Sequence, residues 1–178
     1  EAAELAGADI ELLAFETSDE VYETFIAGGC DITTTDGSAL VGRKVKQQPE
    51  DQEWVIFPAT PISKEPLGPT YGQNDSAWAD AVNWTVYATI ILDEWGVTSA
   101  NVDDHVNDPG EVGRLLGGEG ELQTVMGLSA DAFYQVIKQV GNYDEIYGSN
   151  LNPVGLVREG SANAGWLDGG LIYSPPAR

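Results

Sequence analysis

The sequence predicts an α/β fold, with a parallel-sheet lobe followed by a helical C-terminal segment. Before Leu67, short apolar runs alternate with segments of helical periodicity, the pattern typical of a parallel sheet covered by helices on both faces. After Leu67 the apolar residues recur at helical spacing, and the end of the chain is rich in Gly, Pro and Asn. We therefore expect two parts, an α/β lobe over 1–66 and a helical segment with an irregular tail over 67–178.

After the segment at its very start, the first part contains three predicted strands and two predicted helices. Thr17 and Glu20 have the spacing of a capping box, which predicts a helix running to about Ala27. A second helix is expected from about Ser38 to Gln47. The predicted strands are the apolar runs Ile10–Phe15, Cys30–Thr34 and Trp54–Phe57.

The start of the chain is unusual because Glu1–Ala6 reads as a helix that no strand precedes. Either this helix is a decoration or the chain begins in the middle of a fold, and we favour the second. Because the first residue is Glu1 and no signal peptide follows, we expect a processed or trimmed product.

The second part opens with Leu67–Tyr71, a strand or an extended crossing segment. Asp75 is then expected to cap a long helix that reaches about Trp95 and ends at Gly96. Shorter helices are predicted after it, namely Ser99–Val106, Pro109–Leu116 with Asp108 as its cap, Ala130–Val140 with Ser129 as its cap, and Asn142–Tyr147.

The charge balance excludes some classes of partner. The chain has 29 acidic and 8 basic residues, a formal net charge of −21. Binding to nucleic acid or to an anionic membrane needs a surplus of Lys and Arg, so we expect neither. Such acidity suits a high-salt habitat, and it equally suits an ordinary acidic exported protein.

Residues for catalysis or metal binding are scarce. A single cysteine, Cys30, cannot form an internal disulfide, and a single histidine, His105, makes a multi-histidine zinc site or a histidine-centred triad hard to build. The acidic run between Asp103 and Glu111 lacks the spacing of a calcium-binding loop and is expected to be a solvated helix end. We expect no cofactor, no metal and no catalytic residues.

The best candidate site is the end of the predicted strand Cys30–Thr34. Ligands of α/β sheets bind beyond the carboxyl ends of strands, where Thr34, Thr35 and Asp36 stand in this sequence. The Asp36 carboxylate can accept hydrogen bonds from an ammonium group, and a neighbouring hydroxyl can add another. Alternatively Asp36 caps the following helix, and the two roles can coexist.

Five segments, in this order, resemble the general L-amino-acid-binding proteins, which are periplasmic solute-binding components of polar amino acid ABC transporters. They are Phe15–Glu20, Cys30–Asp36, Ile62–Pro69, Ile137–Tyr143 and Trp166–Pro176. The resemblance covers nearly the whole chain, but only about the C-terminal half of a full-length family member.

The resemblance implies a two-lobed periplasmic-binding-protein fold. Residues 1–66 would be its second lobe without the first strand, and 67–178 would hold the crossing segment and the helices that return to the first lobe. Asp36 matches the acidic residue that binds the ligand α-amino group, and Thr35 matches a position that often touches ligand. A periplasmic location, an L-amino acid ligand and a membrane permease as partner are implied as well. Gly29 departs from the pattern, since the family usually has Arg there.

Two other hypotheses remain. The chain could be a fragment that does not bind ligand by itself and associates with a second copy or with a complementary, missing N-terminal half. A dehydratase-like enzyme on the same fold is less favoured, because no acid–base pair accompanies Asp36 in the sequence.

Overall fold

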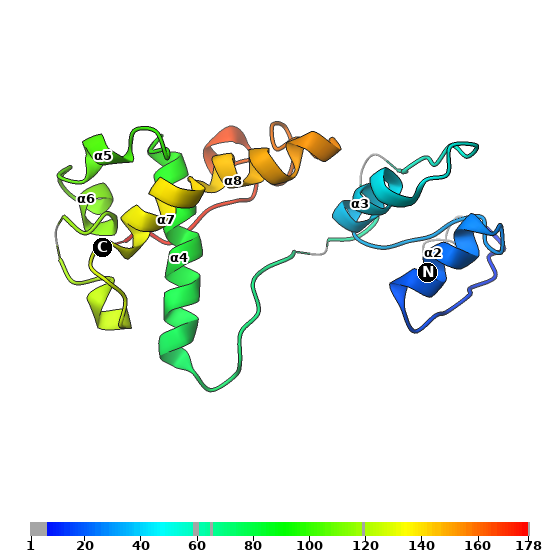
Figure 1. The fold of residues 1–178 in the computed structure, drawn as a ribbon, viewed down its shortest axis with the longest axis horizontal. Helices are drawn as coiled ribbons and strands as arrows, with labels where there is room; N and C mark the ends of the chain where they lie inside the picture. Colours follow the sequence, from blue (N-terminus) through cyan, green and yellow to red (C-terminus); the bar gives the residue numbers. More distant parts are fainter. Residues whose placement is uncertain (1–6, 59–60, 65, 119, 178) are drawn as a thin grey trace. The chain divides into compact units, whose positions relative to one another are not determined.

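The computed structural model describes residues 7–58, 61–64, 66–118 and 120–177, and divides into two compact units (Figure 1). Unit 1 is Glu1–Glu65 and unit 2 is Pro66–Arg178. The helix predicted over Glu1–Ala6 lies outside the described residues.

Among its described residues, unit 1 contains two helices, α2 (Ser18–Ile26) and α3 (Gly37–Gln47). The capping box at the start of α2 is confirmed: the Glu20 N–H donates to Thr17 Oγ1 at 3.3 Å, and the Thr17 N–H donates to the Glu20 carboxylate at 3.0 Å. Each side chain thereby satisfies a backbone N–H that the helix leaves free. Both helices of this unit thus lie where the sequence predicts them.

The strands predicted in unit 1 do not form among the described residues. Ile10–Phe15, Cys30–Thr34 and Trp54–Phe57 run without a turn, but no backbone hydrogen bond joins one to another. Apart from the buried Trp54, most of their large apolar side chains remain in solvent, with Leu12 83% and Val55 70% exposed. A strand is defined by the neighbour it bonds to, so β-forming residues alone do not make a sheet.

Aromatic packing holds unit 1 together instead. The Trp54 ring is buried and lies 5.1 Å from the Phe25 ring and 6.3 Å from the Tyr22 ring, measured between centroids. The Arg43 guanidinium lies over the Tyr22 ring, 4.9 Å from its centroid, and pairs with Asp19 at 2.8 Å. These contacts join α2 and α3 to the Trp54 segment. Cys30, expected to be buried, is half-buried and has a free thiol.

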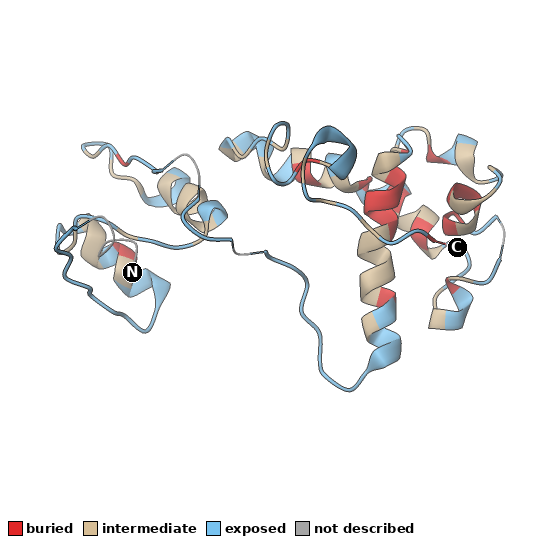
Figure 2. Cartoon of the chain, turned by 180° about the vertical axis from the view of Figure 1, so that it is seen from behind, coloured by how far each residue is buried: buried red, intermediate tan, exposed pale blue. Residues whose placement is uncertain are grey.

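Unit 2 is organised around α4 (Ser76–Glu94). Its predicted cap is confirmed, because the Asp75 carboxylate accepts a hydrogen bond from the Trp78 N–H at 3.0 Å. The helix ends before Gly96, whose φ of +67° is a conformation that glycine adopts without strain. Figure 2 shows the buried residues gathered on the C-terminal half of α4, while its first turns are exposed.

Shorter helices surround this half of α4, and α7 and α8 contact it directly (Figure 1). They are α5 (Val102–His105), α6 (Glu111–Leu115), α7 (Ala132–Val140) and α8 (Tyr143–Asn150). Unit 2 also contains three single 3₁₀ turns among its described residues, at Thr124–Met126, Asn152–Val154 and Trp166–Asp168. The core that they share consists of Ala88, Ile91, Leu92, Val97, Val102, Val112, Leu115, Leu116, Phe133, Ile137 and Ala177.

Two of the predicted helix starts are wrong, because polar side chains are used in other ways. The segment predicted as Ser99–Val106 becomes helical only at Val102, since the Ser99 hydroxyl and N–H both bond to Glu145. Asp108 does not cap α6: its carboxylate bonds to the His105 ring at 2.7 Å, and Gly110 precedes the helix instead.

Two other helix bounds also differ from the prediction. α7 begins after Asp131 rather than Ser129, and α8 extends to Asn150. Its N-cap, Asn142, forms a second capping box, with Glu145. Leu67–Tyr71, predicted as a strand or an extended segment, forms no strand. No helix of the described ranges is long and apolar enough to cross a membrane.

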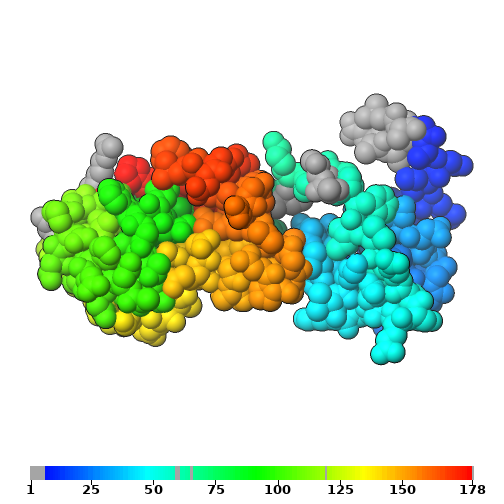
Figure 3. All heavy atoms as spheres, turned by 90° about the horizontal axis from the view of Figure 1, so that it is seen from above, coloured from blue at the N-terminus to red at the C-terminus, as the bar shows by residue number. Residues whose placement is uncertain are grey.

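The tail of unit 2 is irregular, as predicted, but it is anchored. The Ala177 N–H donates to the Glu111 carboxylate at 2.5 Å, and the Arg114 guanidinium donates to the Ala177 carbonyl at 2.9 Å. Ala177 is therefore buried in the core beside α6. In the space-filling view the red atoms of the tail lie against the green atoms of the earlier helices (Figure 3).

Candidate functional site

The segment predicted to bind ligand leads directly into α3. Thr34 and Thr35 are exposed, and Asp36 is half-buried at the N-cap position. The Asp36 carbonyl accepts the hydrogen bond of the Leu40 N–H at 2.9 Å, which starts the helix. Its side chain makes no capping bond.

The Asp36 carboxylate has all of its acceptor capacity left. Among the described residues it forms no hydrogen bond and no ion pair. The sequence left open whether Asp36 caps the helix, binds a ligand, or does both. Because the side chain does not cap α3, it is available to accept hydrogen bonds from an ammonium group of a ligand.

The residue before this segment adds a further polar atom. Thr33 Oγ1 is buried and has no hydrogen-bond partner among the described residues. Thr34 and Thr35 are exposed residues that directly precede Asp36 in the chain. Two exposed threonines and one carboxylate that is unpaired among the described residues thus follow one another at the start of α3.

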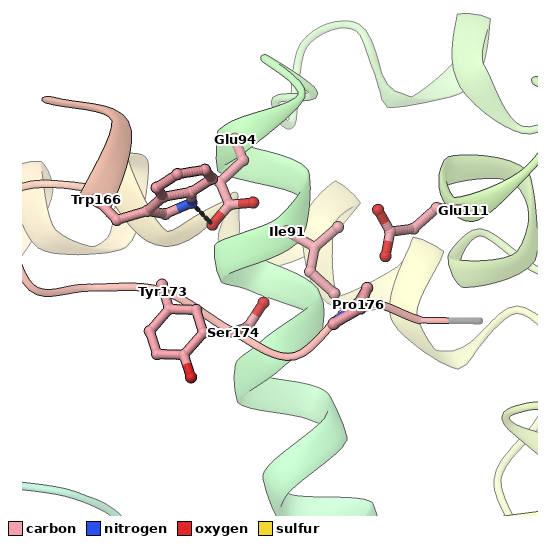
Figure 4. A pocket seen from close by; sticks show the side chains of 7 residues that line it. All are labelled: Ile91, Glu94, Glu111, Trp166, Tyr173, Ser174 and Pro176. Carbon is pink, nitrogen blue, oxygen red and sulfur yellow. Dashed lines mark hydrogen bonds between the residues drawn. The ribbon is translucent and has the colours of Figure 1, made fainter.

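A second hollow lies in unit 2 and was not predicted from the sequence. It encloses about 560 Å³ and is shown in Figure 4. Its walls come from α4, the start of α6 and the C-terminal tail: Ile91, Glu94, Glu111, Trp166, Tyr173, Ser174 and Pro176. Because these residues are far apart in the sequence, only the packing of the tail shows that they share one cavity.

The unit 2 hollow is acidic. The Trp166 indole N–H donates to the Glu94 carboxylate at 3.0 Å, as the dashed line in Figure 4 shows. Burial raises the pKa of Glu94, the Trp166 hydrogen bond lowers it, and the negative charges of Glu111 and Asp93 raise it further, so that the pKa lies above its usual value. Such a cavity disfavours an anionic guest.

Several residues of the acidic run before α6 make contacts within unit 2. Asp103 accepts hydrogen bonds from the Tyr134 hydroxyl and the Lys138 ammonium, both at 2.9 Å. His105 is half-buried beside Asp108 rather than fully on the surface. No group of three or more metal-binding side chains occurs in the part of the chain that the structure describes.

Comparison with known proteins identifies relatives of this chain. No protein-family model matches the sequence. The general L-amino acid-binding periplasmic protein AapJ of Rhizobium johnstonii is 42% identical over 172 residues, which are 93% of this chain and 49% of AapJ. The glutamate/glutamine/aspartate/asparagine-binding protein BztA of Rhodobacter capsulatus is 39% identical and covers 89% of this chain and 47% of its own length. This chain is a homologue of the periplasmic amino-acid-binding proteins. Its resemblance to them, predicted from five sequence segments, is confirmed.

A solved structure agrees with these relatives. The ABC transporter periplasmic binding protein from Brucella ovis, with glutathione bound, matches at a TM-score of 0.89 and 37% identity, over 99% of this chain and 56% of that one. The match supports the periplasmic-binding fold in general, while the parallel sheet is not formed among the described residues. The chain spans about half the length of the relatives that it matches.

Proposed function

We propose that this amino-acid-binding-protein homologue forms part of a solute-binding protein that captures L-amino acids for an ABC importer. The observation that carries the proposal is the similarity to AapJ and BztA, which extends over about nine-tenths of the chain rather than over one motif. The proposal implies a binding protein rather than an enzyme, a periplasmic location, and the membrane permease of the importer as macromolecular partner.

Asp36 is the proposed anchor for the ligand α-ammonium group. Its carboxylate is half-buried and unpaired among the described residues, and an ammonium donor fits it by charge and by hydrogen bonding. Thr35 and Thr34 are exposed residues that directly precede it, and a threonine hydroxyl can accept or donate further hydrogen bonds. These three residues make up the proposed site.

In this proposal, the residues that bind the carboxylate group of the ligand lie outside the Asp36 segment. Among its described residues, unit 1 has a nine-residue helix, an eleven-residue helix and irregular segments around Asp36, and the chain spans about half the length of its relatives. Binding proteins of this architecture gain affinity by closing two lobes around the ligand and removing its water. We therefore infer that residues 1–66 supply one wall of the site and that 67–178 belong mainly to the other lobe.

The experiment is a calorimetric titration with a pool of L-amino acids and with glutathione, because the solved relative carries glutathione. It is run on the chain alone and on the chain joined to the half of AapJ that it does not match, at low and at high salt. The joined protein is expected to bind with a Kd of about 1–10 μM, and the chain alone at least about 100-fold more weakly.

The site assignment is tested in the joined protein. Asp36→Asn is expected to weaken binding by about 100-fold, because it removes the charge that faces the ammonium group. Asp51→Asn is the matched control, since Asp51 is an exposed aspartate of the same unit, and it should change the Kd less than about twofold. Unchanged binding in Asp36→Asn would overturn the site, and no binding by the joined protein would overturn the function.

A second candidate function is association without independent ligand binding. Large apolar side chains are exposed in both units, among them Leu12 at 83% in unit 1 and Leu171 at 71% in unit 2. Surfaces of this kind usually lie against another chain. Light scattering over a range of concentrations tests it: a molar mass that stays at 19.0 kDa would exclude self-association.

A further inference from the structure

The unit 2 hollow carries two carboxylates whose charge is not balanced by an ion pair. Glu94 and Glu111 are half-buried, and neither forms an ion pair with a Lys, Arg or His of the described ranges. Asp93, next to Glu94 in the chain, is by contrast paired with Arg158 at 2.7 Å. Removing a carboxylate from water costs free energy unless a positive charge comes to it. The hollow therefore favours a guest that carries positive charge.

Both carboxylates have acceptor capacity left for such a guest. Glu94 Oε1 accepts the Trp166 indole N–H at 3.0 Å, whereas Glu94 Oε2 forms no hydrogen bond with a described residue. Glu111 accepts one N–H on each oxygen, from Ala177 at 2.5 Å and from the Trp95 indole at 3.2 Å. An ionised carboxylate offers about four acceptor positions, so both groups can bind further donors. The existing bonds also hold the two side chains in place before a guest arrives.

Aromatic and apolar groups make up most of the remaining wall. Trp166 and Tyr173 are 55% and 67% exposed, so their rings are open to a guest. Ile91 and Pro176 add apolar surface (Figure 4). The face of an aromatic ring attracts a cation, and its area can pack against an apolar body. Ser174 Oγ is buried without a hydrogen-bond partner among the described residues, and a guest with N–H groups can supply one.

The size of the hollow is that of a small-molecule site. Its volume is about 560 Å³, within the roughly 300–1,000 Å³ typical of such sites. A calcium or magnesium ion alone suits it poorly, because such an ion takes about six or more oxygen ligands, and the described residues contain no group of three or more metal-binding side chains. The guest that fits the charge, the walls and the volume together is an amine or a guanidine attached to an apolar body.

We propose that the unit 2 hollow binds a small organic cation, in which an ammonium or guanidinium group is attached to an aromatic or aliphatic body. The charged group lies near Glu94 and Glu111 and donates hydrogen bonds to Glu94 Oε2 and Ser174 Oγ. The body packs against the Trp166 ring. This site belongs to unit 2 and is separate from the proposed amino acid site at Asp36 of unit 1, so it goes beyond the proposed function.

The test titrates the ¹⁵N-labelled chain with phenethylamine, phenethyl alcohol and phenylacetate, which share one body and differ in charge. Sodium chloride at about 0.15 M screens exposed charges beyond about 8 Å. The indole N–H signals of Trp166 and Trp95 report on the hollow, because they bond to its two carboxylates, and the Trp54 indole of unit 1 is the internal control. Phenethylamine is expected to shift the first two signals with a Kd of about 0.1–1 mM. The alcohol should bind at least about tenfold more weakly, and the acid should not bind at about 10 mM.

Substitutions in the hollow separate charge from ring contact. Glu94→Gln keeps an oxygen for the Trp166 indole but removes one charge, so it is expected to weaken phenethylamine binding by about tenfold. Glu159→Gln is the matched control, since Glu159 is an exposed glutamate of unit 2 that does not line the hollow, and it should leave the Kd within about twofold. Trp166→Leu, followed by the Trp95 signal, should weaken binding by about two- to fivefold.

Three outcomes would overturn the proposal. They are Trp166 and Trp95 signals that do not move with phenethylamine up to about 10 mM, an alcohol that binds as tightly as the amine, and an unchanged Kd in Glu94→Gln. Should Glu94→Gln fail to fold, the three compounds on the unmodified chain decide by themselves. A failure of the amino acid titration would leave this proposal standing, because Asp36 belongs to unit 1, and a failure here would leave that titration unaffected.

Discussion

The Arg158 guanidinium lies 2.7 Å from the Asp93 carboxylate, and the two side chains are only 11% and 19% exposed. The same guanidinium bonds to Asp144 at 2.9 Å and covers the Tyr143 ring at 4.9 Å. One cation of the tail thus joins the end of α4 to the start of α8. In a chain with 29 acidic residues, it also neutralises two carboxylates that would otherwise repel one another.

Replacing this cation should destabilise unit 2. In Arg158→Ala the partly buried Asp93 loses its partner, and we expect the free energy of unfolding to fall by about 2–3 kcal/mol, somewhat less than for a fully buried pair. Urea denaturation followed by circular dichroism measures it. Lys138→Ala removes an exposed pair with Asp103 and should cost clearly less. Equal losses in the free energy of unfolding for the two variants would contradict the stabilising role assigned to Arg158.

The stability of unit 2 should depend on the charge of Glu145. Burial raises the pKa of Glu145, but hydrogen bonds from the Ser99 hydroxyl and from the N–H groups of Asn142 and Ser99 outweigh burial and bring it below the ordinary value of 4.5. A carboxyl group whose pKa is lower in the folded chain than in the unfolded chain stabilises the fold at pH values above its ordinary pKa. This contribution to the free energy of unfolding is lost as the pH falls through the lowered pKa.

Glu145→Gln tests this dependence. At pH 7 the variant is expected to be less stable by about 1 kcal/mol, allowing for partial exposure of the site. The difference from the unmodified chain should shrink below pH 4.5, because the carboxyl of the unmodified chain then becomes protonated as well. Glu121→Gln, at an exposed glutamate, is the control. A difference that stays constant with pH would refute the charge argument.

Two aspartates at helix starts should differ in their importance for stability. Asp75 accepts the Trp78 N–H, so Asp75→Ala is expected to cost about 1 kcal/mol. The Asp36 side chain makes no capping bond, so Asp36→Ala should cost less than about 0.5 kcal/mol. Urea titrations of both variants decide it. A large loss in Asp36→Ala would mean that Asp36 caps α3 after all, which would weaken its assignment as a free ligand anchor.

Two glycines should respond oppositely to alanine. A Cβ at Gly113 of α6 would lie 1.9 Å from the Asp108 carbonyl oxygen, so Gly113→Ala must displace backbone and is expected to cost about 2–3 kcal/mol. At Gly42 of α3 a Cβ would meet nothing within 4 Å, and Gly42→Ala should stabilise the helix by about 0.5–1 kcal/mol. Hydrogen exchange assigns each change to its unit. A stabilised Gly113→Ala variant would show that α6 is free to move away from Asp108.

Local signals were enough for most helices. The capping box of Thr17 and Glu20, the cap at Asp75 and the stop at Gly141 act within one turn, so a single sequence reveals them. The predicted caps at Asp108 and Ser129 were wrong because the same short side chains have several possible partners. His105 lies one turn before Asp108 and takes its carboxylate, a choice that the sequence pattern does not rank.

The candidate site, like the helices, could be predicted from the sequence only in part. Position in the chain and charge indicated Asp36, Thr35 and Thr34, but only the structure shows that the Asp36 carboxylate is unpaired among the described residues. The cavity beside Trp166 had no signal in the sequence other than the aromatic residues of the tail. Glu94 and Trp166 are in contact because the tail folds back onto α4. The sequence around either residue contains no pattern that predicts this contact.

By itself the sequence determined the helices, the acidic character and the resemblance to amino-acid-binding proteins, because each depends on residue type and short spacing. The tertiary structure decided which carboxylates are paired, how the tail closes the core of unit 2, and that the strand-forming segments of unit 1 lack partners among the described residues. The physical reason is range: a helix satisfies its hydrogen bonds within one segment, whereas a strand and an ion pair need a partner that another part of the chain must bring.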